Sequence, residues 1–274
     1  MFSRLKKLLD GGAAQQAAVP QTDRRAAWSG ESLVQPRHVL CFLGAERELR
    51  RLRDATNAAI AEFATGFGVD DACSTAAPDE RMSRSFEICR DRVEPDAWTR
   101  ADAEAVGAHQ SVLYVLGPRM TRDNAVRATI GALFLVDRLI DAGAVAVKGE
   151  SAGVAHGLHR WRELIRMGAV ATDRDDTLAQ NRVGRLAFAR RPLGSDGYFE
   201  SVGFHLVGLP DVQVPRSRGT DCDSVAIMDA VADEIVRQGI DATLHARDAL
   251  LVDDGSHDED DFKFNPYGIV RLST

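Results

Sequence analysis

The sequence predicts an α+β fold, with a mixed or mainly antiparallel sheet covered by helices mainly on one face. Three observations lead to this prediction. The chain of 274 residues is 45% hydrophobic and 27% charged, which is typical of a globular protein. Short apolar runs, several of them ending at glycine, are followed by longer amphipathic segments. The two kinds of segment succeed one another in a mixed order, which favours α+β.

The first 35 residues differ in composition from the rest. Residues 1–10 could form a short amphipathic helix with Phe2 and three leucines on one side and three basic side chains on the other. An isolated helix of this length is marginally stable in water. A frayed leader is the simpler interpretation, and a weak membrane-surface or partner anchor is the alternative. Residues 11–35 are rich in small and polar residues without apolar periodicity. We therefore predict a flexible leader and linker over 1–35 and one α+β domain over 36–274.

An internal repeat is visible in the first half of the predicted domain. Val39–Gly44 and Val112–Gly117 share Val, Leu, Leu and Gly at four of six positions. Both runs are apolar, short and closed by glycine, which predicts buried strands. Each precedes a long segment with helical apolar spacing, Glu46–Ala64 and Asp123–Asp141, and Ala144–Val147 then reads as another strand. The pattern predicts a possible duplication of a strand–helix–strand unit.

The remaining elements follow from shorter signals. Predicted strands are Phe86–Cys89, Gly184–Arg190, Tyr198–Leu206, Val212–Val214, Ala242–Val252 and Tyr267–Leu272. Predicted helices are one capped by Thr99 and ending at Ala108, one at Val154–Met167 and one capped by Asp221. Residues 253–261 are acidic without the ligand order of a calcium loop, so we expect a solvated loop there.

Charge and cysteine usage exclude several classes of protein. The formal net charge is −7, aromatic residues make up 6% of the chain, and no phosphate-binding glycine motif is present. These features argue against a nucleic-acid partner and leave no cofactor to predict. The four cysteines show no C-x-x-C spacing, which fits a reducing cytoplasm without a zinc knuckle. No apolar run approaches the ~20 residues of a membrane span, so stable membrane association is not expected.

The segment from Lys148 to Trp161 is the richest in chemistry. A strand ends, a glycine-containing loop follows and a helix is predicted to begin, an arrangement that often forms binding sites. The candidate binding residues are Lys148, Glu150, His156, His159 and Trp161. Glu150, His156 and His159 are also an alternative metal-ligand set, although their spacing lacks the H-E-x-x-H order. Capping groups and surface histidines are the simpler interpretation.

Ser151 gives an alternative prediction. Gly149-Glu-Ser-Ala-Gly153 matches G-x-S-x-G between a strand and a predicted helix, which is typical of a nucleophile elbow. Asp211 and either His245 or His257 follow in the order of a hydrolase triad. No oxyanion-loop motif accompanies them. The alternative is therefore a serine hydrolase with Ser151, Asp211 and His245 as its catalytic residues.

Three segments together resemble a known family. They are Ala128–Trp161, the run Phe204–Val214 with its Gly-Leu-Pro-Asp turn, and Asn-Pro-Tyr-Gly at 265–268. They are similar to a bacterial family of cytoplasmic α+β proteins known only as a domain of unknown function. The resemblance implies an α+β domain over roughly residues 37–274, and genes beside toxin or secretion genes, but no catalytic residues. We therefore expect a non-enzymatic protein-binding or regulatory protein, toxin-neutralising (immunity-type) or secretion-associated.

Overall fold

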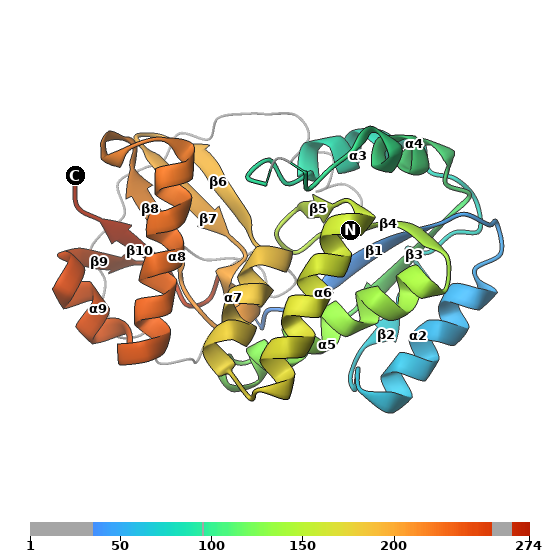
Figure 1. Cartoon of the computed structure of the whole chain (residues 1–274), viewed down its shortest axis with the longest axis horizontal. Coiled ribbons are helices and arrows are strands. Elements are labelled where there is room, and N and C mark those ends of the chain that lie inside the picture. Colours follow the sequence, from blue (N-terminus) through green and yellow to red (C-terminus); the bar gives the residue numbers. More distant parts are fainter. Residues whose placement is uncertain (1–34, 95, 254–264) are drawn as a thin grey trace.

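A computed structural model describes residues 35–94, 96–253 and 265–274. The predicted leader and linker before residue 35, most of the acidic segment and His257 lie outside the described residues. The described chain forms eight helices and two five-stranded sheets, in two lobes that lie side by side (Figure 1). Antiparallel pairs dominate, and β8 and β10 form the parallel pair in the second sheet. The α+β class is confirmed.

The first lobe is built on the sheet β2-β3-β1-β4-β5. Its strands are β1 (Val39–Gly44), β2 (Gly68–Val69), β3 (Ser111–Leu116), β4 (Ala144–Gly149) and β5 (Val154–His156). Helices α2 (Arg50–Glu62) and α5 (Arg122–Asp141) connect β1 to β2 and β3 to β4. Each connection passes over one strand of the other unit, so the two strand–helix–strand units interleave as a split βαβ pair. Two strand–helix–strand units are thus present, and their origin by duplication stays a prediction.

Helices cover both faces of the first sheet, with the larger group on one face. That group consists of α2, α5, α6 (Leu158–Asp173) and α7 (Thr177–Phe188). Alternation along β1 explains this, because Leu40 and Phe42 enter the larger core while Cys41 and Leu43 enter a smaller one. The smaller core is closed by α3 (Arg81–Cys89) and α4 (Arg100–Ala108). Thr99 caps α4 through a capping box with Asp102, as predicted for the cap.

The second lobe is built on the sheet β6-β7-β8-β10-β9. Its strands are β6 (Arg190–Ser195), β7 (Tyr198–Val202), β8 (Asp211–Pro215), β9 (Ala249–Val252) and β10 (Ile269–Leu272). Helices α8 (Asp221–Gln238) and α9 (Ile240–Arg247) pack on this sheet. Met228, Val231, Ala232 and Ile235 recur at helical spacing on α8 and fill a separate hydrophobic core.

Several predicted strands are helices in the structure. Phe86–Cys89 belongs to α3, because Met82, Phe86 and Cys89 recur at helical spacing on its buried face. Residues 184–188 belong to α7, where Gly184 allows close packing: a Cβ there would lie 2.6 Å from Val207 Cγ1. Residues 242–247 likewise belong to α9.

Other predictions are wrong only at their boundaries. The helix expected from Val154 begins at Leu158, because Val154–His156 pairs with β4 as an edge strand. The strand expected over 198–206 ends at Val202 and is followed by a 3₁₀ helix, Phe204–Val207. The N-cap of α8 is Thr220, one residue before the predicted Asp221.

The two lobes meet along helix α7 and its neighbours. The 3₁₀ helix Phe204–Val207 of the second lobe packs on α5 and α7, and α8 packs on α7. A turn at Gly203 and Gly208, both in the left-handed region of φ, brackets that 3₁₀ helix. The boundary predicted at residue 36 and the single domain over 36–274 stay predictions, while the described residues hold two sheets with separate cores.

Candidate functional site

Ser151 lies in a tight turn between two strands. The turn connects β4 to β5, so the context is strand–turn–strand instead of the strand–turn–helix of a nucleophile elbow. The Ser151 hydroxyl donates to the Arg37 carbonyl at 2.8 Å and accepts from the Val39 amide at 2.9 Å. The side chain is buried, with 1% of its surface exposed. The hydroxyl therefore ties the start of β1 to the β4–β5 turn.

The other two members of the predicted triad belong to the second lobe. Asp211 accepts hydrogen bonds from Ser201 at 2.8 Å, from the Phe204 amide at 3.1 Å and from Asn265 at 2.7 Å. Burial raises the pKa of Asp211 to about 7, against the lowering effect of these donors. His245 lies on an exposed face of α9. Within the described residues, neither side chain hydrogen-bonds to Ser151.

Lys148 and Glu150 form a buried ion pair on the α3 face of the first sheet. Lys148 Nζ lies 2.8 Å from Glu150 Oε1 and 2.5 Å from Ser85 Oγ. Burial alone would lower the pKa of Lys148, but the charge and hydrogen bond of Glu150, together with the nearby Cys41 and Cys89, outweigh burial and raise the pKa. A lysine held in its charged form cannot serve as a base for Ser85. The pair is therefore a structural contact between β4 and α3.

Of the predicted histidine and tryptophan residues, His156 and Trp161 pack together inside the fold, while His159 lies apart on the surface. His156 donates through Nε2 to the Ala187 carbonyl at 3.1 Å and packs edge-on against Trp161. Trp161 is buried and donates to the Val147 carbonyl at 3.3 Å. His159 is exposed on α6 and lies 3.4 Å from Glu163. Among residues 35–94, 96–253 and 265–274, no group of three or more His, Cys, Asp or Glu side chains has a metal-binding arrangement.

A cleft of about 270 Å³ lies between the lobes, and we call it the interlobe cleft. It is lined by the end of α3 and the segment after it, by β5, by the α7–β6 junction and by the first turn of α8. The lining residues are Cys89, Arg90, Asp91, Arg92, Val93, Val154, Ala189, Arg190, Arg191, Pro192, Leu193, Asp221, Cys222 and Val225. None of the predicted site residues is among them.

Backbone contacts fix the segment that brings the first arginines to the cleft. Arg90 forms a parallel bridge with Ala155 of β5, and the Asp91 amide donates to the Ala155 carbonyl at 2.8 Å. The Asp91 carboxylate lies 3.4 Å from His156 Nδ1 on the same strand. These contacts extend the end of α3 along the edge of the first sheet, and Arg92 lines the cleft together with residues of β6 from the second lobe.

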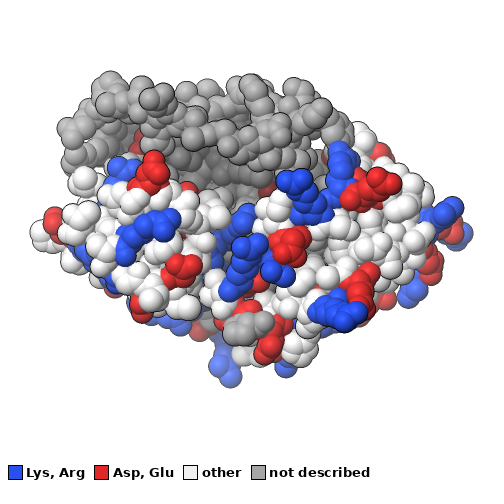
Figure 2. Space-filling view, turned by 90° about the horizontal axis from the view of Figure 1, so that it is seen from above, with Lys and Arg blue, Asp and Glu red and all other residues white. Residues whose placement is uncertain are grey.

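The arginines of the cleft differ in their partners. Arg90 lies 3.2 Å from Glu87, and Arg191 lies 3.0 Å from Asp229 while also donating to the Arg185 carbonyl. Within the described parts of the chain, the guanidinium groups of Arg92 and Arg190 have no hydrogen-bond or ion-pair partner. Figure 2 shows basic side chains gathered where the lobes meet on the upper face, with acidic ones among them.

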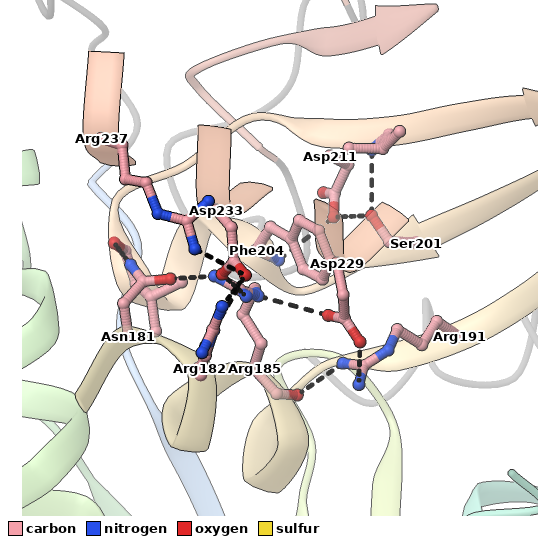
Figure 3. Close-up of polar contacts among 12 residues, drawn as sticks. Asn181, Arg182, Arg185, Arg191, Ser201, Phe204, Asp211, Asp229, Asp233 and Arg237 are labelled. Carbon is pink, nitrogen blue, oxygen red and sulfur yellow. Dashed lines mark hydrogen bonds and ion pairs between the residues drawn. The ribbon is translucent and has the colours of Figure 1, made fainter. Parts of the chain in front are cut away.

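A second arginine cluster lies nearby and is fully paired. We call it the α7–α8 seam, made of Arg182 and Arg185 from α7 and Asp229 and Asp233 from α8 (Figure 3). Arg185 is 1% exposed and donates to Asp233 at 2.8 Å, with Asp229 at 3.4 Å. Arg182 donates to Asp233 at 2.8 Å through Nε. Burial alone would raise the pKa of Asp233, but these donors lower it.

Comparisons with protein-family models, with curated proteins and with solved structures gave no match to this chain. The resemblance to a bacterial family therefore stays a prediction. No helix in the described part of the chain is both long and apolar enough to cross a membrane.

Sequence reasoning missed the interlobe cleft altogether. The available signals were the Arg90-Asp-Arg92 run and the Arg190-Arg191 pair, each beside an apolar segment. Such runs are usually solvated faces, and nothing in their spacing shows that segments about 100 residues apart meet. These arginine runs indicate a binding site only once the structure shows which guanidinium groups have partners within the chain.

Proposed function

We propose that the protein is a non-enzymatic binding protein and that the interlobe cleft is its binding site. The observation that carries the proposal is the pair of unpartnered guanidinium groups, Arg92 and Arg190, in a cleft that is also lined by the apolar side chains of Val93, Val154, Leu193 and Val225. A few convergent polar groups in an apolar concavity are the usual composition of a binding site. Arginine that makes no intramolecular ion pair is available for a ligand.

The contacts of the polar residues favour binding over hydrolysis. Ser151, Lys148 and His156 are each occupied by hydrogen bonds within the fold. Among the described residues that line the cleft there is no serine or histidine. Labelling with a fluorophosphonate tests the alternative directly: we expect no Ser151-dependent adduct, and an adduct that disappears in Ser151→Ala would restore the hydrolase hypothesis.

The size of the cleft bears on what it accepts. A volume of about 270 Å³ lies just below the usual range for small-molecule pockets, about 300–1,000 Å³. A side chain projected by a protein partner fits such a space. We further propose a protein partner and a toxin-neutralising or secretion-associated role, which the resemblance supports. The cysteine usage supports a cytoplasmic location. No nucleic-acid partner is proposed.

Native mass spectrometry of the protein purified from its own cells tests the proposal. Leu193→Trp fills the cleft, and Leu250→Trp is the matched control because Leu250 is exposed on β9. We expect a bound species with the wild type and Leu250→Trp, and its loss with Leu193→Trp. A species that Leu193→Trp retains, or the absence of any bound species from the wild type, would contradict the proposal.

A further inference from the structure

Resting on the proposed binding function, we propose that the group bound in the interlobe cleft is an oxyanion, a carboxylate or a phosphate, held by Arg92 and Arg190. The two guanidinium groups come from different lobes, Arg92 after α3 and Arg190 at the start of β6. Arginine presents a planar fork of donors that fits the paired oxygens of a carboxylate or phosphate.

The balance of charge in the cleft supports an anionic ligand. Four lining residues are arginines and two, Asp91 and Asp221, are acidic, so the lining carries four positive and two negative charges. Asp91 lies beside His156, while Arg90 and Arg191 are paired with Glu87 and Asp229 outside the lining. The lining arginines without a carboxylate partner among the described residues are therefore Arg92 and Arg190. The whole chain carries a formal net charge of −7, so this excess is local. A low-dielectric concavity with one sign of excess charge concentrates ions of the opposite sign.

Apolar side chains beside the arginines favour a ligand whose oxyanion is attached to a carbon skeleton. Val93, Val154, Leu193 and Val225 line the cleft beside the arginines. Carbon atoms of the ligand can pack on this wall while the oxyanion faces the guanidinium groups. Asp221, in the first turn of α8, has no ion-pair partner among the described residues and opposes an anion. This carboxylate provides a variant that should strengthen binding.

Isothermal titration calorimetry at low salt tests the proposal with three probes: glutarate, inorganic phosphate and a capped peptide with one glutamate. We expect at least one probe to bind the wild type and Arg92→Gln/Arg190→Gln to weaken it by roughly tenfold or more. The matched control is Arg174→Gln, because Arg174 is exposed at the end of α6. It should change the Kd by less than about twofold, and Asp221→Asn should tighten binding by roughly two- to fivefold.

The outcomes separate this inference from the function on which it rests. Tightest binding of the peptide identifies an acidic side chain of a protein partner, and tightest binding of glutarate or phosphate identifies a free anion; both support an oxyanion site. Failure of all three probes, or equal binding by the double variant, would overturn the oxyanion assignment. If native mass spectrometry still finds a species that Leu193→Trp abolishes, the binding function stands and only its chemistry is wrong.

Discussion

The α7–α8 seam and the interlobe cleft use the same side chain in opposite ways. In the seam, Arg185 is buried and paired with Asp233 and Asp229, so the fold itself supplies its counter-charges. In the cleft, Arg92 and Arg190 face a hollow and have no such partner among the described residues. A buried guanidinium without a counter-charge would destabilise the fold, whereas one that faces solvent needs no partner within it. We propose that a bound ligand supplies the counter-charge for the two arginines of the cleft.

Removing a carboxylate from the seam should have the largest effect on stability. Asp233→Ala leaves Arg185 buried with Asp229 as its remaining carboxylate, beside the hydrogen bond that it donates to Asn181, and a broken buried pair costs about 3–5 kcal/mol. Urea denaturation should show this loss in the free energy of unfolding. The control is Asp173→Ala at the exposed end of α6, expected to change it by less than about 0.5 kcal/mol. Equal effects at both positions would show that the seam does not stabilise the fold.

Asp211 sharpens the comparison because it is a buried carboxyl without a guanidinium. Its hydrogen-bond donors are Ser201, the Phe204 amide and Asn265. In Asp211→Asn, the new side-chain NH₂ group would face some of these donors, so we expect the free energy of unfolding to fall by about 1–3 kcal/mol. Burial raises its pKa to about 7 from an ordinary value of 3.8. Between these two values the folded carboxyl binds a proton that the unfolded one releases, so lowering the pH across this window favours folding.

The measurement is the difference in unfolding free energy between wild type and Asp211→Asn from pH 4.5 to 7.5. We expect the wild-type advantage to grow as the pH falls through this window, because the variant lacks the proton uptake. A difference that shrinks with falling pH would mean that the pKa of Asp211 is lowered in the folded state, as it is for Asp233.

Asp229 links the two regions and should affect both. It lies 3.4 Å from Arg185 and 3.0 Å from Arg191, and its side chain is 33% exposed. Asp229→Asn should lower the free energy of unfolding, measured by urea denaturation, by about 1 kcal/mol. This is less than the loss expected for Asp233→Ala, because the Asp229 carboxylate is partly solvated. It also leaves Arg191 without its carboxylate at the cleft, so glutarate binding by calorimetry should tighten. Weaker binding would show that Arg191 must stay paired to shape the cleft.

Sequence patterns predicted the first lobe better than the second. Strands β1, β3 and β4 and helices α2 and α5 were predicted because long periodic segments and glycine-closed apolar runs report local structure directly. Predictions from short apolar runs were less successful. Taken by itself, Phe86–Cys89 resembles a strand, and the helical spacing becomes visible only when Met82 is included. Ser151 matched a catalytic motif, yet the motif does not encode whether a helix or a strand follows. The cleft depends on contacts between residues 89–93, 154, 189–193 and 221–225, which no local pattern contains.

The smallest expected effect on stability is the most informative one. Without ligand, Arg92→Gln/Arg190→Gln should leave the free energy of unfolding within about 0.5 kcal/mol of the wild type, or raise it slightly, because no intramolecular ion pair is lost. Thermal unfolding of both proteins with and without the best-bound oxyanion measures this. We predict equal stability without ligand and a rise in Tm with ligand in the wild type only. A variant that is clearly less stable without ligand would show that these arginines hold the lobes together, contrary to a binding role.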